Sequence, residues 1–301
     1  MGWRRLRNVP LRTGLHSVPG LACPTHRRYS GCMTTPDLHA VPRDLLGRHA
    51  LVCGASAGIG RASALALAAR GASITALARR ADRLDSLLPE LRAAGAAEAR
   101  ALVADLDRRA DLADRVEALI EAHGPVHIVI NNTGGPPGGP LLQAEPEAFS
   151  VAFGRHILAA HILARVCVPG MQASGFGRIV NVVSTSVYEP IPNLGVSNTI
   201  RGAMGGWAKS LSRELPEGVT INNVLPGFTD TERLTSLAEG RARREGSSSD
   251  QVRANWLAQV PEGRLGRPEE TAAAVAFLCS PSAAYIRGVS LPVDGGRLRG
   301  I

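Results

Sequence analysis

The feature that most constrains the fold is a regular alternation of short apolar runs with longer stretches of helical periodicity, beginning near residue 48. Seven apolar runs have the length of buried strands: 49–53, 72–78, 100–104, 126–130, 177–183, 219–224 and 289–293. The stretches with helical spacing are 58–70, 82–94, 109–123, 146–171, 197–215 and 268–279. Alternation of this kind builds βαβ units. We therefore expect an α/β fold, a single-domain Rossmann-like doubly wound parallel sheet of about seven strands with helices on both faces.

A glycine-rich loop joins the first predicted strand to the first predicted helix. Its sequence, GASAGIG over residues 54–60, places glycines at positions 54, 58 and 60. Glycines there allow a tight turn, let backbone N–H groups approach a pyrophosphate, and permit close packing of helix on sheet. A tight turn without any ligand would use the same residues. The position of the loop within the first βαβ unit favours dinucleotide binding.

Charge and composition exclude several classes of partner. The net charge of +8 is concentrated in residues 1–40, which contain six arginines and one acidic residue, Asp37. The remainder shows no basic stripe with interleaved aromatic residues, so we expect no nucleic-acid partner. The five cysteines have no spacing typical of zinc ligands, so we expect no metal. No uninterrupted apolar run reaches the roughly 18 residues that a spanning helix needs, so we expect no membrane contact.

We divide the chain into an Arg-rich tail, 1–43, and one domain, 44–301. The tail resembles a mitochondrial presequence in charge, but Pro10, Pro19 and Pro24 disfavour a single amphipathic helix. The alternatives are a disordered extension or a misassigned start, with Met33 as the true first residue. We expect a cytoplasmic protein, with organelle targeting by the tail as the alternative.

From residue 44 to residue 301 the chain resembles the short-chain dehydrogenase/reductase family, and its overall sequence is similar to the 3-oxoacyl-carrier-protein reductases of that family. The resemblance rests on motifs in their family order: Gly54, Gly58 and Gly60; Asp105; Asn131-Asn132-Thr133-Gly134; Pro226-Gly227; Arg264 to Glu270; and Val293 to Gly296. It implies a bound nicotinamide dinucleotide. The implied cofactor-binding residues are Gly54, Ser56, Ala57, Gly58, Ile59, Gly60, Arg61, Arg79, Asp105, Leu106, Asn131, Thr133, Gly134, Arg201, Pro226, Gly227, Thr229 and Thr231.

The end of the second predicted strand indicates which dinucleotide is bound. Members of the family that bind NAD carry an acid where this chain has Ala78, and Arg79 follows as in members that bind NADP. A 2′-phosphate needs cationic donors, and Arg61 is a second candidate. The alternative is that both arginines are simply solvated. We expect NADP(H) rather than NAD(H).

Three of the four catalytic positions of the family hold other residue types here. Ser184 follows the fifth predicted strand, as in the family, but Ser197 and Arg201 occupy the positions of its Tyr-x-x-x-Lys pair. The asparagine of the family is replaced by His156. In the family the tyrosine protonates the substrate oxygen, and the lysine lowers its pKa and holds the ribose. Serine is far less acidic than tyrosine, and arginine does not titrate in proteins.

Two nearby residues are candidates for the missing proton donor. Tyr188 lies four residues after Ser184, and His156 carries an imidazole whose ordinary pKa is about 6.5. Our hypothesis is that Ser184 and Ser197 polarise a carbonyl while Tyr188 or His156 supplies the proton, directly or through water. The alternative is that Tyr188 only forms a pocket wall and that His156 is only a hydrogen-bonded helix residue.

The resemblance also indicates a substrate lid at residues 229–263 and a further pocket wall at 136–140. The apolar lid residues Leu234, Leu237, Val252, Trp256 and Leu257 suit acyl-like or cyclic ketones. We expect an NADP(H)-dependent oxidoreductase that reduces a carbonyl or oxidises an alcohol, and a homotetramer or homodimer. The alternative is a catalytically silent dinucleotide-binding protein that acts as a sensor or assembly partner.

Overall fold

The computed structural model describes residues 41–300 of the protein, and residues 1–40, which hold most of the predicted tail, lie outside the described part. Within the described residues seven strands form one parallel sheet in the order β3-β2-β1-β4-β5-β6-β7. The strands are β1 His49–Cys53, β2 Ser73–Ala78, β3 Ala99–Val103, β4 Ile128–Asn131, β5 Gly177–Val182, β6 Val219–Pro226 and β7 Ser290–Val293. The predicted fold class is confirmed, and each predicted strand is present within about two residues of its expected position.

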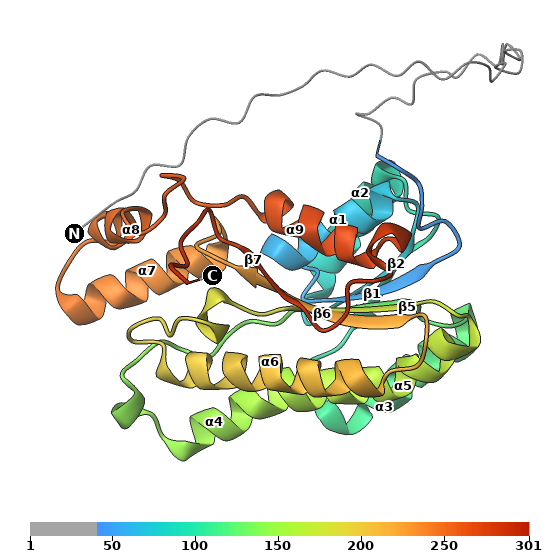
Figure 1. The fold of residues 1–301 in the computed structure, drawn as a ribbon, viewed down its shortest axis with the longest axis horizontal. Coiled ribbons are helices and arrows are strands. Elements are labelled where there is room, and N and C mark those ends of the chain that lie inside the picture. The colour runs from blue at the N-terminus through green and yellow to red at the C-terminus, as the bar shows by residue number, and fades with distance from the viewer. Residues whose placement is uncertain (1–40, 301) are drawn as a thin grey trace, which may run out of the picture. The chain divides into compact units, whose positions relative to one another are not determined.

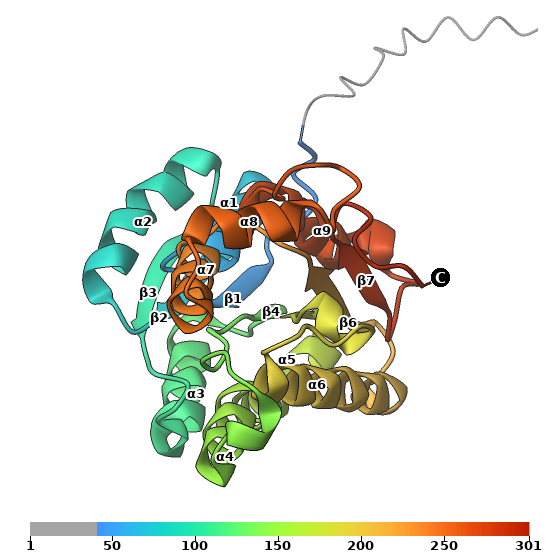
Figure 2. The same cartoon turned by 90° about the vertical axis from the view of Figure 1, so that its left-hand side faces the viewer.

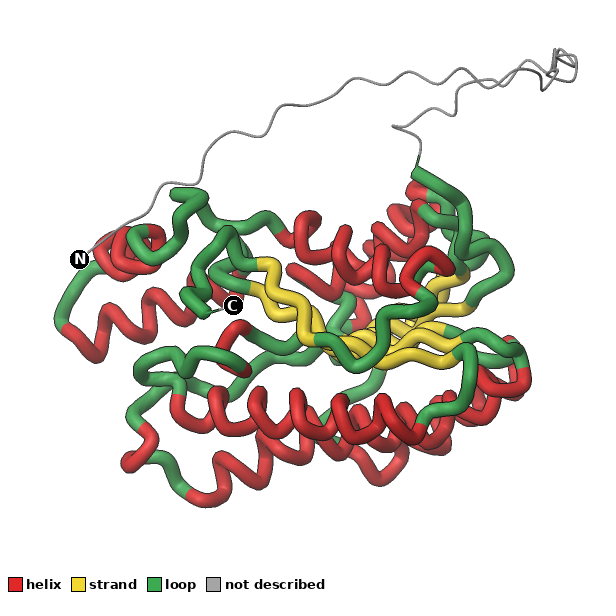
Figure 3. Tube along the Cα trace, in the orientation of Figure 1, coloured by secondary structure: helices red, strands yellow, loops and turns green. Residues whose placement is uncertain are grey.

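Helices cover both faces of the sheet (Figures 1 and 2). One face carries α1 Gly58–Ala69, α2 Ala81–Ala94 and α9 Pro268–Cys279, and the other carries α3 Leu112–His123, α5 Ala159–Ala173 and α6 Gly195–Glu214. The remaining helices are α4 Pro146–Phe153, α7 Glu232–Glu245 and α8 Ser249–Leu257. Figure 3 shows the strands as a single layer between the two helical layers. The inner strands β1, β2, β4, β5 and β6 are therefore almost completely buried, which explains their nearly unbroken apolar runs. The edge strands β3 and β7 are partly exposed.

The core consists of two apolar layers separated by the sheet. In β1, Ala50 and Val52 pack with α1, α2 and α9, whereas Leu51 and Cys53 pack with α3, α5 and α6. All four are completely buried. Because successive strand side chains point to opposite faces, a central strand needs apolar residues at every position. Because all seven strands are parallel, their carboxyl ends lie at the same edge of the sheet, where the functional site lies.

The predicted helix 146–171 is one continuous helical run with an irregular middle. A π-helical turn, Gly154–Leu158, joins α4 to α5 and contains His156. The run Pro146–Ala173 is long and apolar enough to cross a membrane by length and composition alone, which corrects the expectation that no such stretch exists. Half of its apolar window is buried, and α5 packs on the sheet. Its apolar character is therefore that of a core helix.

A row of polar side chains, which we call the asparagine ladder, crosses the second half of the sheet. It consists of Asn131 on β4, Asn181 on β5, Asn223 on β6 and Ser290 on β7, which are register partners on adjacent strands. Asn131 Nδ2 donates to Asn181 Oδ1 at 2.8 Å, and Asn181 Nδ2 donates to Asn223 Oδ1 at 2.8 Å. Asn223 Nδ2 donates to Ser290 Oγ at 3.0 Å. A register slip would leave buried amides unpaired, so the ladder holds the four strands in register.

Replacing the central amide of the ladder should destabilise the fold. In Asn181→Leu, the Asn131 donor and the Asn223 acceptor lose their partners in a buried environment. Each unsatisfied group costs about 1–3 kcal/mol, so we expect the free energy of unfolding to fall by about 2 kcal/mol or more. Urea denaturation measures it. Asn255→Ala, on the exposed surface of α8, is the control and should change stability by less than about 0.5 kcal/mol. Equal stability of Asn181→Leu and the wild type would contradict the role of the ladder.

Candidate functional site

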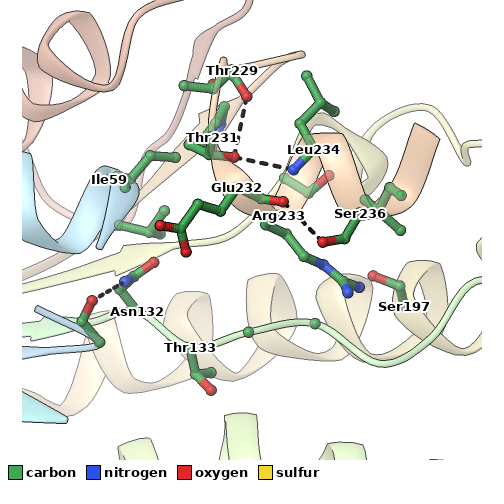
Figure 4. Close-up of a pocket in the computed structure, with 18 of the residues that line it drawn as sticks. Ile59, Asn132, Thr133, Ser197, Thr229, Thr231, Glu232, Arg233, Leu234 and Ser236 are labelled. Atoms are coloured by element: carbon green, nitrogen blue, oxygen red, sulfur yellow. Dashed lines mark hydrogen bonds between the residues drawn. The ribbon is translucent and has the colours of Figure 1, made fainter. Parts of the chain in front are cut away.

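A cavity of about 580 Å³ lies beyond the carboxyl ends of the strands, at the point where the strand order reverses between β1 and β4. In open α/β sheets this reversal is where ligands bind. Its walls come from the loops after β1, β2, β3, β4, β5 and β6, from the start of α6, and from α7. Figure 4 shows part of this wall, with Ile59 and Ser197 on opposite sides of the cavity. The six loops after these strands therefore build one common site.

The glycine loop forms the floor of the cavity and is shaped by steric exclusion. A Cβ atom on Gly60 would lie only 2.2 Å from the carbonyl oxygen of Gly54, so α1 touches the strand turn directly. Gly54 has a φ of +63° and Gly58 a φ of +53°, which disfavour other residue types. Asn132 Nδ2 donates to the carbonyl oxygens of Cys53 at 3.3 Å and Gly54 at 3.5 Å. The turn is thus fixed by α1 on one side and by the Asn132 side chain on the other.

The N-terminus of α1 faces the cavity without a side-chain cap. Its N-cap residue, Ala57, makes no capping hydrogen bond, and its first turn contains no acidic residue. Ser56, Ala57, Gly58 and Ile59 all line the cavity. The backbone N–H groups of a 12-residue helix are therefore directed at the cavity and can bind an anion such as a pyrophosphate. This geometry fits the role that the sequence predicts for the loop.

Two arginines line the cavity at the end of β2. Arg79 and Arg80 are exposed there, and Arg80 Nη2 donates to Ser56 Oγ at 3.2 Å. The family pattern indicated Arg79 but not Arg80, although the two are adjacent. Asp105 and Leu106, after β3, also line this end of the cavity, as predicted. The combination presents two cationic donors where a 2′-phosphate would lie.

Arg61 does not belong to this cationic end. Its guanidinium forms an ion pair with Glu90 of α2, and it does not line the cavity. The second turn of α1 directs the side chain towards α2, away from the sheet edge. The prediction that Arg61 binds the cofactor is therefore wrong.

Asn131 and Gly60 are also placed differently from the prediction. The Asn131 amide belongs to the asparagine ladder and is buried, and the adjacent Asn132 lines the cavity instead. Gly60 serves the contact with Gly54 and does not line the cavity. Thr133 and Gly134 do line it, as predicted. Because alternate strand residues face opposite ways, one position along the chain separates a ladder residue from a cavity residue.

Ser184, Ser197 and Arg201 all line the cavity, as predicted. Ser184 follows β5, and its Oγ accepts a hydrogen bond from the N–H of Ser186 at 3.1 Å, which leaves its own hydroxyl proton available. Ser197 lies in the first turn of α6 and Arg201 lies one turn later, so both project from the same face. Arg201 Nη1 donates to the carbonyl oxygen of Val182 at 3.0 Å.

A second arginine, from the lid helix α7, reaches the same place. A Cβ atom on Gly135 would lie 3.5 Å from Arg201 Nη2, 3.7 Å from Arg233 Nη2 and 3.8 Å from Ser197 Oγ, and we call this position the Gly135 point. Figure 4 shows the Arg233 guanidinium beside Ser197. Arg233 Nη2 also donates to the carbonyl oxygen of Pro136 at 2.7 Å. Burial, and then the charge of Arg233, lower the pKa of Arg201 to about 10, so Arg201 stays protonated at neutral pH.

Tyr188 is not at the site. Its side chain is 59% exposed and does not line the cavity. Its hydroxyl donates to the carbonyl oxygen of Ser290 on β7 at 3.1 Å. A 3-10 turn at Thr185–Val187 carries the chain outwards before Tyr188, which directs the ring towards β7. The hypotheses that Tyr188 donates the proton or forms a pocket wall are therefore wrong.

His156 is close to the site, but its surroundings disfavour protonation near neutral pH. It is buried in the π-helical turn, and its Nε2 has no hydrogen-bond partner within residues 41–300. Burial, together with the charges of Arg201 and Arg155, lowers the pKa of His156 to about 2. It borders a separate cavity of about 10 Å³ that Asn131 and Arg201 also line. Burial among cations therefore disfavours the protonated form of His156, against the expectation of an imidazole that exchanges protons near pH 6.5.

The predicted lid consists of two helices with their own apolar cluster. Thr231 Oγ1 caps α7 by accepting from the N–H of Leu234 at 3.2 Å, and Phe228 stacks on Trp256 of α8 at 5.2 Å. The start of α7 touches the glycine loop, since a Cβ atom on Gly58 would lie 3.2 Å from Thr231. Of the predicted apolar lid residues, Leu234, Leu237 and Trp256 line the cavity. Pro226, Gly227 and Thr229 line it as well, as predicted.

Besides Arg80, four further arginines line the cavity that the sequence pattern did not indicate: Arg155, Arg233, Arg241 and Arg244. Three of them lie on α7, where they are spaced along a helix with several other charges. The available signal was the arginine content of the lid. It could not show which arginines face inwards, because that depends on how α7 packs.

Comparison with known proteins gives matches over most of the chain. The family model described as enoyl-(acyl carrier protein) reductase matches residues 54–297. The chain is 35% identical over 256 residues to 3-oxoacyl-[acyl-carrier-protein] reductase FabG of Vibrio cholerae, covering 84% of this chain and 98% of that protein. It is 33% identical over 266 residues to 2,3-dihydroxy-2,3-dihydro-p-cumate dehydrogenase of Pseudomonas putida, covering 88% and 98%. The solved structure of L-sorbose reductase from Gluconobacter frateurii, complexed with NADPH and L-sorbose, matches with a TM-score of 0.80 at 28% identity, over 87% of this chain and 100% of that one.

The buried imidazole makes stability depend on pH in a defined direction. The folded state holds His156 neutral down to a pKa of about 2, whereas the unfolded chain protonates it below about 6.5. The unfolded state therefore binds more protons below pH 6.5, and this group lowers stability as pH falls, by at most about 1.4 kcal/mol per pH unit. In His156→Asn we expect stability relative to the wild type to rise as pH falls from 6.5 to 5. Urea denaturation at each pH measures the free energy of unfolding of both proteins. At pH 8 the imidazole is neutral in the folded and the unfolded state, so the difference between the two proteins there gives the effect of the substitution on packing. Parallel curves for the two proteins would contradict the assignment.

Proposed function

Because this chain belongs to the short-chain dehydrogenase/reductase family, we propose that it is an NADP(H)-dependent oxidoreductase that reduces a carbonyl group or oxidises the corresponding alcohol. The observation that carries the proposal is one continuous cavity. It joins an uncapped helix N-terminus and two arginines at the end of β2 to Ser184, Ser197 and Arg201 at the start of α6. An anion-binding end and a polar end suited to a carbonyl oxygen thus lie in one site.

The residues of the cavity fit NADP(H). The glycine loop, where added Cβ atoms would clash, leaves room for backbone N–H groups to bind a pyrophosphate. Arg79 and Arg80 are placed to bind a 2′-phosphate, and Ala78 offers no acid for the 2′-hydroxyl of NAD(H). When bound, the nicotinamide supplies a hydride to the carbonyl carbon, or accepts it from the alcohol carbon in the reverse direction. The NADPH complex of the related L-sorbose reductase supports this choice.

The proton chemistry of the proposed reaction depends on charge rather than on an acidic side chain. Ser184 and Ser197 donate hydrogen bonds to the substrate oxygen, and Arg201 stabilises the negative charge that develops there. Arg201 remains protonated and therefore does not donate the proton to the product. The proton comes from water through the Ser197 hydroxyl. Loss of a general acid costs typically about 10²- to 10⁴-fold in rate. A charged donor directed at the developing oxyanion recovers about 10²- to 10³-fold.

The alternative function is a catalytically silent dinucleotide-binding protein. The absence of Tyr188 and of a titrating His156 from the cavity favours this alternative, since neither proposed proton donor is available. The continuous cavity and the lid favour an enzyme. Turnover decides between the two.

We also propose that the protein forms a homodimer or homotetramer. Three apolar side chains of the α4–α5 run are substantially exposed: Val151 at 43%, Phe153 at 40% and Leu158 at 41%. Apolar surface of this kind supports self-association. A small-molecule carbonyl or alcohol substrate and a cytoplasmic location complete the proposal.

The choice of cofactor can be tested with arginine variants. Arg79→Gln combined with Arg80→Gln removes both cations at the end of β2, so we expect NADPH to bind about 10- to 100-fold more weakly while NADH binding stays within about twofold. Cofactor fluorescence titration measures both dissociation constants. Arg61→Gln is the matched control, because that side chain pairs with Glu90, and it should leave the Kd for NADPH unchanged. An equal loss for NADH and NADPH would point away from a 2′-phosphate site.

Turnover tests the reaction itself. We expect the purified protein to bind NADPH and to oxidise it with at least one member of a broad carbonyl panel. Ser197→Ala and Arg201→Gln should lower kcat, the latter by about 10²- to 10³-fold, because both act on the substrate oxygen. Tyr188→Phe should leave kcat unchanged. Tight NADPH binding without turnover on any substrate would favour the silent binder, and a large loss in Tyr188→Phe would contradict the proton route.

A further inference from the structure

The cavity is strongly cationic at the end next to Ser197. Arg201, Arg233 and Arg244 all line it there, from α6 and the lid helix α7. The acids that line the cavity lie elsewhere: Asp105 follows β3, and Glu232 pairs with Arg83 of α2 at 2.9 Å. The charge at the Ser197 end is therefore not balanced by the acids of the cavity wall.

These three arginines also lack acidic partners within residues 41–300, where no carboxylate oxygen lies within 4.0 Å of their guanidinium nitrogens. Two other arginines of the cavity are paired, Arg155 with Asp107 and Arg241 with Glu245 at 2.7 Å. Arg79 and Arg80 also have no carboxylate partner among the described residues, but they lie at the end of β2, in the part of the cavity suited to a phosphate. Bringing unpaired like charges together is unfavourable unless a counter-charge joins them. The arrangement is complementary to an anion.

The geometry of the Gly135 point is that of an anion site. Two guanidinium nitrogens and one hydroxyl oxygen surround it at 3.5, 3.7 and 3.8 Å, and the absence of a side chain on Gly135 keeps it open. Arg244 extends the cationic surface along the same loop, since its Nη2 lies 3.4 Å from the position of a Cβ atom on Gly138. The Gly135 point itself lies at bonding distance from the Gly135 Cα, so a ligand atom sits just beyond it, in van der Waals contact with the glycine. A carboxylate oxygen there can accept hydrogen bonds from both guanidinium groups after small side-chain shifts.

We propose that the substrate is a carbonyl compound that carries a carboxylate, a keto acid or the corresponding hydroxy acid, with the carboxylate bound beside Gly135 by Arg201 and Arg233. This inference rests on the proposed oxidoreductase function and adds the substrate class. Arg201 serves both the carbonyl and the carboxylate through different N–H groups, and the hydroxyl of Ser197 serves the carbonyl, so the two groups lie close to each other in the substrate. A thioester of a long acyl chain, which is neutral around its carbonyl, would leave these charges without a partner.

The phosphates of the cofactor are the other anions that this cavity would receive. The groups suited to them are the N-terminus of α1 and the arginines at the end of β2. Arg233 instead faces Pro136 and Ser197, on the side of the cavity away from Ile59 (Figure 4). The carboxylate site and the phosphate sites are therefore separate parts of the cavity, and variants can distinguish them.

The sharpest test fills the Gly135 point without removing a charge. In Gly135→Ala the new methyl group meets its neighbours only at ordinary contact distances, 3.5 to 3.8 Å, so the fold should tolerate it while the anion is excluded. Gly139→Ala, on the same loop with nothing within 4 Å, is the matched control. The probe is oxalate, titrated calorimetrically into the protein with and without NADP⁺. We expect Gly135→Ala to weaken oxalate about 10- to 100-fold and Gly139→Ala to have no effect.

Charge variants provide a second arm. Arg233→Gln should weaken oxalate to a similar extent, and Arg244→Gln should weaken it less, while the Kd for NADPH stays within about twofold. Arg243→Gln, on an exposed position of α7 that does not line the cavity, is the control. If Arg233→Gln weakens NADPH instead of oxalate, the arginines bind a cofactor phosphate and the inference is overturned. Failure of the wild type to bind oxalate would also overturn it.

Substrate selectivity separates this inference from the proposed function. We expect the wild type to reduce 2-, 3- or 4-oxo acids at least about tenfold better in kcat/KM than their methyl esters, and Gly135→Ala to lose that preference. Oxalate binding without NADPH turnover would support the anion site while the oxidoreductase proposal fails. Turnover of neutral ketones or of esters equal to that of the acids would support the oxidoreductase and overturn the anion site.

Discussion

The site depends on one backbone contact, in which α1 meets the turn after β1 with no side chain between them. The carbonyl oxygen of Gly54 occupies the space that a Cβ atom on Gly60 would need, and Asn132 holds the same carbonyl from the neighbouring loop. This contact sets how far α1 projects over the sheet edge and directs its free N–H groups into the cavity. The start of α7 then packs against Gly58 through Thr231, so the lid is positioned from the same turn.

The part of the site around Ser197 is positioned by the sheet, and α7 contributes positive charge to it. The asparagine ladder holds β4 to β7 in register, which brings the loops after β4, β5 and β6 to one edge. On that edge, Ser197 in place of a tyrosine is a smaller side chain and leaves room that Arg233 approaches from α7. The proposed chemistry follows from this exchange. A family site with one acidic hydroxyl becomes a site with several positive charges, which suits stabilisation of an oxyanion and recognition of a carboxylate.

Much of the fold was predictable because apolar periodicity reports burial directly. Every predicted strand and helix is present, and the helix 268–279 agrees at both ends with α9. The site was predictable where a backbone motif defines it, as in the glycine loop. The site was not predictable where a long side chain can contact any of several neighbouring residues. Arg61 and Arg80 are both arginines near the glycine loop, yet one pairs with Glu90 and the other donates to Ser56. Only the packing of α1 against α2 separates these two outcomes.

The sequence by itself determined the architecture and the dinucleotide loop, because these follow from local patterns and from spacing along the chain. The resemblance to the family identified the substituted catalytic positions. The tertiary structure alone decided which charged and titratable groups lie at the cavity. Tyr188 is four residues from Ser184 but points to β7, and His156 is buried among cations, whereas Arg233 arrives from a distant helix. The physical reason is that protonation and electrostatic stabilisation depend on distance and burial in space, and neither can be read from separation along the chain.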